Sequence, residues 1–322
     1  MLAAVESLPH PFPASSGAFQ AATGRKTPAP LDCGVRASFE LFPPKTPAAE
    51  EALWSCVRKL EPLAPAFISV TYGASGSTRA PTRELVSRLV SETRAPAAAH
   101  LTCVGASRDE IDAILHDYWN AGVRHIVALR GDAPEGAQGA PARHANGYAN
   151  ATQLTAAIRR FADFDVSVGC YPEGHPESPS LAHDIDVLKA KQDAGANRAI
   201  SQFFFDVDAF LRFAERASNA GVTIPILPGI LPVANFASLA RMARTCGASL
   251  PNWVANLFDG LDDDPETRRL VACSLAAETC ARLQDEGFRQ FHFYTLNRPE
   301  MAFAVCRRLG LRADATISET VQ

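Results

Sequence analysis

The chain has no long apolar run, no paired cysteines and no excess of positive charge. No stretch approaches the roughly 18 consecutive apolar residues that a transmembrane helix needs, so a membrane-spanning protein is not expected. The 322 residues carry 31 Lys and Arg against 35 Asp and Glu, so we expect no nucleic-acid partner. Hydrophobic residues make up 47% and charged residues 20%, which is the composition of a soluble globular protein with one large domain or two ordinary ones.

The eight cysteines occur singly. None forms the C-x-x-C pair that commonly holds zinc or an iron–sulfur cluster, so no metal is expected there. A chain of this size needs no disulfide, and we expect reduced thiols in a cytoplasmic protein. The acidic run 261–264 could suggest a metal site. However, Asp264 followed by Pro265 is also the pattern of a helix N-terminus, which we favour.

The first 34 residues are rich in Pro, Ala, Ser, Gly and Thr and lack apolar periodicity. Such a segment cannot bury enough apolar surface to offset its ordering entropy, so a disordered extension is expected over 1–34. Residues 1–10 have neither a basic region nor an apolar run, and we expect no signal peptide. The folded domain is expected over 35–322.

From residue 35 onward, short apolar runs alternate with longer amphipathic stretches. Strands are expected at 35–42, 66–72, 98–103, 125–130, 165–171, 198–205, 225–231 and 290–296. Helices are expected at 48–60, 83–91, 107–121, 151–161, 181–194, 207–220, 236–245, 265–286 and 299–309. This alternation indicates βαβ units and a parallel sheet.

Eight strands followed by helices predict an α/β fold, a (β/α)₈ TIM barrel forming one catalytic domain. The competing arrangement is a doubly wound sheet. It would usually carry a G-x-G-x-x-G turn, and the segment YGASGS at 72–77 has only two glycines. We therefore favour the barrel. Its active site is expected at the C-terminal ends of the strands.

Polar residues gather where the predicted strands end. They are Glu40, Thr71, Tyr72, His100, Thr102, Arg130, Gly131, Asp132, Tyr171, Glu173, His175, Gln202, Asn297 and Arg298. A core needs no such groups, and burying polar ones unpaired costs a few kcal/mol each, so their convergence predicts a site. No predicted strand carries a lysine, which argues against a Schiff-base aldolase.

Two carboxylates in this set are candidates for chemistry. Glu40 lies in the apolar segment SFELFPP, where burial should raise its pKa and let it act as a general acid near neutral pH. The alternative is a structural ion pair with an arginine such as Arg130. Asp132 could stabilise positive charge in a transition state, or simply cap the following loop. His100 on a strand is typical of a core histidine, whereas His175 in a Gly/Pro loop is a better functional candidate.

Eight segments, in chain order, carry a family resemblance: SFELFPPKT, FISVTYGA, HLTC, HIVALRGD, YPEGHPE, AGANRAISQFFFD, PGILPV and FHFYTLNR. The chain closely resembles 5,10-methylenetetrahydrofolate reductase of the bacterial single-domain type, over about residues 35–312. The resemblance implies noncovalent FAD at the strand C-termini and ping-pong hydride transfer. NADH or NADPH reduces the flavin, and 5,10-methylenetetrahydrofolate then becomes 5-methyltetrahydrofolate. It also implies a role in methionine synthesis and a homo-oligomer, often a tetramer.

The resemblance also implies roles for individual residues. Glu40 matches the general acid that protonates the folate, and Asp132 the carboxylate beside the flavin pyrimidine. Gln202 matches a residue that contacts folate and nucleotide in turn, Arg298 one that faces the glutamyl tail, and Thr71 a residue at both substrate and flavin. Implied flavin contacts are Thr71, Tyr72, Ala74, His100, Arg130, Gly131, Asp132, Tyr148, Ala149, Tyr171, His175, Asp184 and Lys191.

The chain departs from the family pattern at four positions. Val187 and Ala190 stand where relatives can supply Asn and Arg to the flavin, and Ser238 and Met242 replace a Gln and a Phe that can contact substrates. The diphosphate is therefore expected to be held by fewer side chains. Two other functions stay open: a flavin-free barrel lyase or aldolase, and a folate- or flavin-binding protein without turnover. The choice between NADH and NADPH also stays open.

Overall fold

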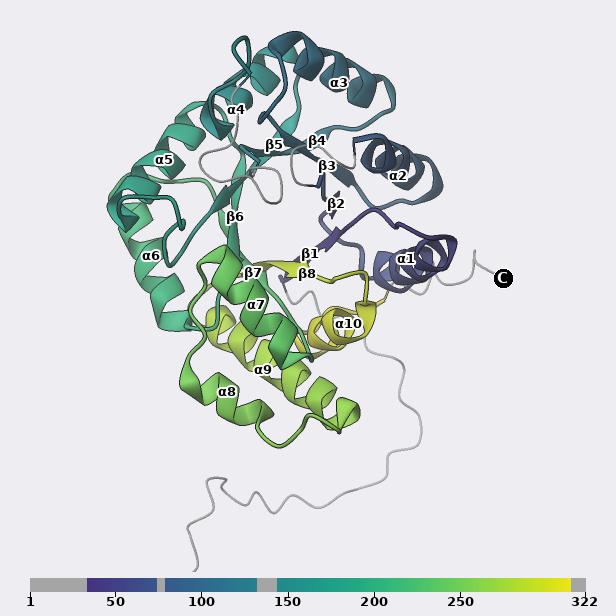
Figure 1. Ribbon diagram of the computed structural model, residues 1–322, viewed down its shortest axis with the longest axis vertical. Helices are drawn as coiled ribbons and strands as arrows, with labels where there is room; N and C mark the ends of the chain where they lie inside the picture. Colours follow the sequence, from purple (N-terminus) through teal and green to yellow (C-terminus); the bar gives the residue numbers. More distant parts are fainter. Residues whose placement is uncertain (1–33, 74–78, 132–143, 314–322) are drawn as a thin grey trace, which may run out of the picture. The chain divides into compact units, whose positions relative to one another are not determined.

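Eight parallel strands close into a barrel in chain order in the computed structural model, which describes residues 34–73, 79–131 and 144–313 (Figure 1). The strands are β1 (Arg36–Leu41), β2 (Ile68–Val70), β3 (Ala97–Thr102), β4 (His125–Leu129), β5 (Asp165–Cys170), β6 (Arg198–Phe203), β7 (Ile226–Ile230) and β8 (Gln290–Tyr294). β8 pairs with β1 and closes the sheet. The predicted TIM barrel is confirmed.

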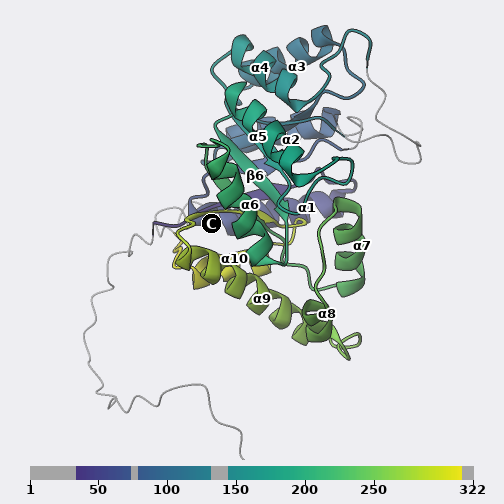
Figure 2. The ribbon, with the colours of Figure 1, turned by 90° about the vertical axis from the view of Figure 1, so that its left-hand side faces the viewer.

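Helices surround the barrel (Figures 1 and 2). They are α1 (Pro47–Leu60), η1 (Glu61–Leu63), α2 (Arg79–Glu92), α3 (Arg108–Asn120), α4 (Ala151–Phe161), α5 (Leu181–Asp193), α6 (Val207–Asn219), α7 (Phe236–Cys246), α8 (Asn252–Phe258), α9 (Pro265–Asp285) and α10 (Pro299–Arg308). The Asp264 side chain accepts a hydrogen bond from the N–H of Thr267, with Pro265 in the first turn. The run 261–264 is therefore a helix start, as expected.

The short helix α8 was not expected from the sequence. It has seven residues, and Pro251 at its N-terminus makes no side-chain cap, so the usual start signals are missing. Val254 and Phe258 of α8 are buried in a cluster that also contains Leu239 of α7 and Leu275 of α9. Tertiary packing against two longer helices therefore stabilises a segment whose local signals are weak.

A polar cluster lies in the N-terminal half of the barrel interior. Arg198 donates to Nε2 of His125 at 3.1 Å and to the Asp165 carboxylate at 2.7 Å, and Ser167 Oγ lies 2.7 Å from the same imidazole nitrogen. Burial is the largest of the effects that lower the pKa of His125, to about 3. Because Arg198 can only donate, the neutral ring accepts at Nε2. This end of the barrel is thus occupied by hydrogen-bonded polar side chains, and the opposite end carries the cavity.

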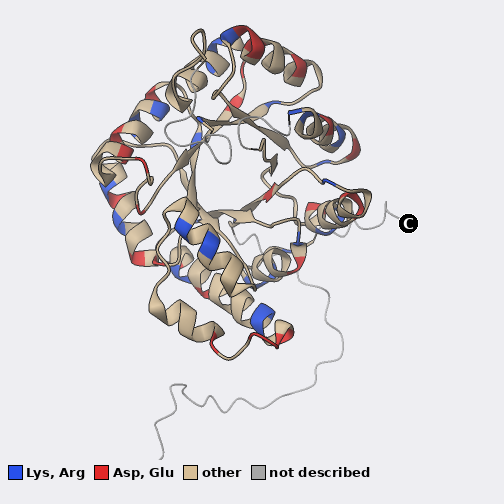
Figure 3. Cartoon of the chain, in the orientation of Figure 1, with Lys and Arg blue, Asp and Glu red and all other residues tan. Residues whose placement is uncertain are grey.

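Acidic and basic residues are interspersed along the surrounding helices (Figure 3). In the described part of the chain, no helix is both long and apolar enough to cross a membrane. Five cysteines in that part, Cys56, Cys170, Cys273, Cys280 and Cys306, are free thiols, which agrees with the expected reduced state. Cys33 lies outside the described residues.

Candidate active site

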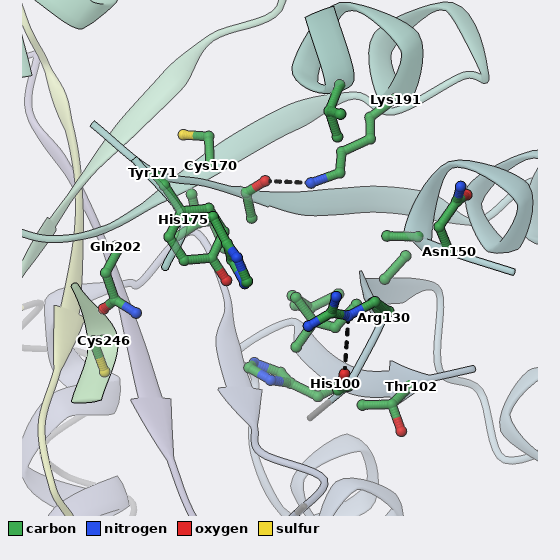
Figure 4. Close-up of a pocket in the computed structure, with 18 of the residues that line it drawn as sticks. His100, Thr102, Arg130, Asn150, Cys170, Tyr171, His175, Lys191, Gln202 and Cys246 are labelled. Carbon is green, nitrogen blue, oxygen red and sulfur yellow. Dashed lines mark hydrogen bonds between the residues drawn. The ribbon is translucent and has the colours of Figure 1, made fainter. Parts of the chain in front are cut away.

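A cavity of about 1000 Å³ opens at the C-terminal ends of the strands (Figure 4). Because parallel strands of a barrel all end at one rim, residues far apart in the sequence meet there. The predicted site residues that line it are Glu40, Thr71, Tyr72, His100, Arg130, Gly131, Ala149, Tyr171, His175, Asp184, Lys191 and Gln202. The structure therefore brings most of the predicted site together.

Glu40 lies at the end of β1 with 21% of its side chain exposed. Its Oε2 is 3.5 Å from Nε2 of His100 and 3.7 Å from Nε2 of His292. Burial is the largest single influence and raises the pKa of Glu40, but the contact with His292 and the charges that both histidines can carry lower it, and the net pKa is below its ordinary value. The prediction of a raised pKa for Glu40 is wrong, because the sequence showed only the apolar neighbours of this residue and not the two histidines.

The alternative of an ion pair between Glu40 and Arg130 is also wrong. Arg130 NH1 binds the carboxylate of Glu177 at 2.6 Å, and its Nε donates to the carbonyl of Gly131. The guanidinium holds the pKa of Glu177 below its usual range. Arg130 and Glu177 both line the cavity, so its mouth contains a charged pair that sequence reasoning did not identify.

His292 is the main functional residue that the sequence analysis missed. It is buried on β8, and its Nδ1 lies 2.8 Å from the hydroxyl of Ser38 on the paired strand β1. The Ser38 hydroxyl has one proton: when it donates to Nδ1, the ring proton lies on Nε2, which faces Glu40, and when it donates to the Phe291 carbonyl at 3.3 Å, Nδ1 carries the ring proton. The segment QFHFY contained the signal: with a period of two, His292 and Tyr294 share one face of a buried strand.

Burial defines the state of two further groups around the cavity. It lowers the pKa of His100 against the attraction of Glu40, so His100 is neutral at pH 7. Burial also lowers the pKa of Lys191, whose Nζ donates to the carbonyl of Gly169 at 2.8 Å (Figure 4). Asp184 accepts from the backbone N–H of His175 and so fixes the loop that carries this imidazole.

The cavity has the donors for a large anionic ligand. Arg130 and Lys191 supply cationic side chains, and residues 149–153 at the N-terminus of α4 also line it. Buried polar atoms without a hydrogen-bond partner among the described residues include Nε2 of His100 and Oγ1 of Thr102, both of lining residues. Gly131 has φ +90°, and an added Cβ would lie 2.6 Å from Val104 Cγ1. The backbone at Gly131 therefore packs closely against the side chain of Val104.

Among the described residues that were predicted at the site, Tyr148, Glu173, Asn297 and Arg298 do not line the cavity. Tyr148 packs its ring against the guanidinium of Arg108, and Arg298 is exposed at the start of α10. Ala74 and Asp132 lie outside the described residues. Of the four departures from the family pattern, Val187, Ala190 and Met242 line the cavity. Ser238, the fourth, lies in the first turn of α7, where its N–H donates to the side chain of Asn235.

The fold and the site together define the class: a (β/α)₈-barrel protein with a ligand pocket at the C-terminal rim of its strands. The family model for methylenetetrahydrofolate reductase matches residues 31–310. The chain therefore belongs to the methylenetetrahydrofolate reductase family.

Several named proteins are similar to this chain over most of its length. It is 47% identical over 286 residues to 5,10-methylenetetrahydrofolate reductase of Pectobacterium carotovorum subsp. carotovorum, covering 89% of this chain and 94% of that one. It is 48% identical over 278 residues to the Escherichia coli (strain K12) protein of the same name, covering 86% and 92%. The maize protein methylenetetrahydrofolate reductase (NADH) 1 is 33% identical over 292 residues, and the match covers 87% of this chain and 49% of that protein.

One solved structure has the same fold at low sequence identity. It is a Clostridium thermocellum protein described as binding two copies of 5-methyl-5,6,7,8-tetrahydrofolic acid. The match has a TM-score of 0.57 and 16% identity, and it covers 86% of this chain and 94% of that one. At this identity the similarity supports the barrel fold alone.

Proposed function

We propose that this protein reduces 5,10-methylenetetrahydrofolate to 5-methyltetrahydrofolate, with NADH or NADPH as electron donor and noncovalent FAD as the relay. The observation that carries the proposal is the position of Glu40, a carboxylate held beside two histidines in a cavity that also contains Arg130 and Lys191. Membership of the family supports the reaction. The product methyl group would serve methionine synthesis in the cytoplasm.

The residues of the cavity fit FAD. Arg130, His175 and Lys191 would hold its diphosphate together with the N-terminus of α4, since backbone N–H groups and cations both favour phosphate there. Gly131 has no side chain and would allow a flat ring to approach the strand end. A bound flavin supplies the capacity to accept and donate hydride, which no protein side chain provides.

Glu40 acts as the proton donor to the folate. Its pKa is lowered, so the carboxylate must gain a proton before it can act as an acid. Burial is already the largest influence on this pKa, and a folate ring above the carboxylate adds to it, which raises the pKa toward the range of a general acid. The imidazole of His292, which contacts Ser38 through Nδ1, lies 3.7 Å from the carboxylate and stays beside it during this step.

Folate and nucleotide use the same part of the cavity in turn. Gln202 lies across the cavity from Arg130 and Lys191, so a substrate there would lie beside the flavin position (Figure 4). Thr71 lines the cavity near the end of β2, and the exposed Arg298 would receive the glutamyl tail at the rim. Asp132 would stand next to the flavin pyrimidine and stabilise positive charge on the folate. The active form would be a homo-oligomer.

The experiment separates the two half-reactions under anaerobic conditions. Flavin in Glu40→Gln should be reduced by NADH or NADPH at about the wild-type rate, whereas its reoxidation by methylenetetrahydrofolate should slow by about 10²-fold or more, the usual size of an acid–base contribution. Glu50→Gln on α1, whose carboxylate pairs with Arg88 at the surface, is the matched control and should leave both rates unchanged.

Two outcomes would count against the proposal. Unchanged reoxidation in Glu40→Gln would remove Glu40 from proton transfer and leave the rest of the assignment standing. Wild-type protein that is colourless and cannot be reconstituted with FAD would contradict the flavin-dependent reaction itself and favour a flavin-free barrel enzyme.

A further inference from the structure

Strand β6 departs from regular pairing next to the candidate substrate site. Ile200 pairs with Leu227 of β7, but the next pair is Phe203 with Gly229, so three steps on β6 match two on β7. This is a β-bulge with one extra residue at 201–202. A regular strand would turn adjacent side chains to opposite faces, yet Gln202 and Phe203 both line the cavity. Ile200 and Gln202 follow the ordinary alternation and both line the cavity, so the bulge is what brings the next side chain, Phe203, to the cavity beside Gln202.

Two side-chain hydrogen bonds anchor the backbone at the bulge. Backbone groups along this segment point alternately to the two neighbouring strands. The N–H of Asn197 donates to the carbonyl of Val166 on β5, whereas the N–H of Ala199 donates to the carbonyl of Pro225 beside β7. Ser201, two residues after Ala199, therefore turns its backbone groups toward β7. There the N–H of Gly229 donates to the Ser201 hydroxyl at 2.8 Å. The Ser201 carbonyl accepts the hydroxyl of Tyr294 from β8, also at 2.8 Å. Three strands thus hold the bulge.

Gly229 makes this arrangement possible. The phenol of Tyr294 reaches across it, and a Cβ at Gly229 would lie 2.7 Å from Cε2 of Tyr294 and collide with the Ser201 carbonyl. Burial raises the pKa of Tyr294 well above its ordinary value, so the phenol keeps its proton and can donate. The Gln202 Oε1 accepts from the N–H of Phe203 at 3.0 Å, and its amide nitrogen points into the cavity (Figure 4).

We infer that Ser201, Gly229 and Tyr294 are positioning residues for Gln202, and that the β6 bulge they hold sets the affinity for both substrates. The inference rests on the proposed function, in which Gln202 contacts folate and nucleotide in turn. Tyr294 itself lines the cavity, and because its hydroxyl donates to the Ser201 carbonyl, the inference assigns its effect to the backbone of β6 rather than to contact with the reacting atoms. Its loss should therefore weaken substrate binding and leave the chemical step and flavin binding unchanged.

The test compares Tyr294→Phe with the wild type in steady-state and half-reaction kinetics. We expect the KM for methylenetetrahydrofolate and for the nucleotide to rise about ten-fold, with kcat within about two-fold and an unchanged Kd for FAD. Tyr118→Phe is the matched control, because Tyr118 is a buried tyrosine outside the cavity lining whose hydroxyl has no hydrogen-bond partner among the described residues. It should leave all these constants unchanged.

A double-mutant cycle with Gln202→Ala decides whether the effect passes through Gln202. If it does, Tyr294→Phe adds nothing further to KM in the Gln202→Ala background. Additive effects, an unchanged KM, or a fall in kcat like that of Glu40→Gln would overturn the inference. If Tyr294→Phe unfolds, Ser201→Ala removes the partner of Gly229 from the same bulge and must give the same pattern. Wild-type protein without turnover would instead refute the proposed function.

Discussion

Replacing Glu177 by Gln should strengthen the binding of FAD. Glu177 and Arg130 form an ion pair at 2.6 Å at the cavity, and the proposed function assigns Arg130 to the flavin diphosphate. The diphosphate must then compete with the Glu177 carboxylate for the same guanidinium. Glutamine keeps the size of the side chain and removes its charge, so the variant tests the competition with little change in packing.

The exposure of the pair sets the size of the effect. The side chains of Arg130 and Glu177 are 33% and 51% exposed, which places the pair in the class of partly exposed ion pairs worth about 0.2–1 kcal/mol. Releasing that energy lowers the Kd for FAD by about 1.5- to 5-fold. Because the pKa of Glu177 is lowered, its carboxylate is ionised above its ordinary pKa of 4.5 and throughout neutral pH. The effect should therefore be constant there and shrink as salt screens the pair.

The assay is a titration of the apoprotein with FAD, followed by the quenching of flavin fluorescence, at low and at high salt. Glu50→Gln serves as the control, since Glu50 forms a comparable ion pair with Arg88 away from the cavity. Weaker FAD binding in Glu177→Gln would refute the reasoning, because Glu177 would then support the cofactor site rather than compete for it. An effect that is the same at both salt concentrations would show that charge is not the cause.

Three further predictions concern the same site. Lys191→Met should raise the Kd for FAD about ten-fold or more, while Lys189→Met, which removes the exposed partner of Asp193 on the same helix, should not. Gly131→Ala should unfold at clearly lower denaturant than Gly287→Ala; both glycines have positive φ, but only the Cβ at Gly131 meets neighbours. Because the pKa of Glu40 is lowered, its ionised form stabilises the fold above about pH 4.5, and this stabilisation is lost as pH falls through the folded-state pKa. The free energy of unfolding of Glu40→Gln in urea should therefore depend less on pH than that of the wild type between about pH 3 and 6.

Local patterns in the sequence were sufficient for the barrel and for most of its rim. Strands β1 to β8 lie where apolar runs predicted them, because a strand buried on both faces must be apolar along its length. The segments that end these strands predicted the cavity lining for the same reason: polar side chains such as Arg130 and Gln202 are tolerated only where a strand leaves the core. The helix α8 escaped prediction because it has few residues and no side-chain cap.

The sequence alone thus determined the fold class and the residues that meet at the strand ends, since these depend on periodicity and on chain order, and eight motif segments in order indicated the family by resemblance. The tertiary structure alone decided which partner each charged group has. Glu40 has a lowered rather than a raised pKa because His292, from the far end of the chain, closes the barrel beside it. Arg130 pairs with Glu177, and a bulge held from β7 and β8 brings both Gln202 and Phe203 to the cavity. Electrostatics and strand register depend on neighbours in space, and only the closed barrel brings those neighbours together.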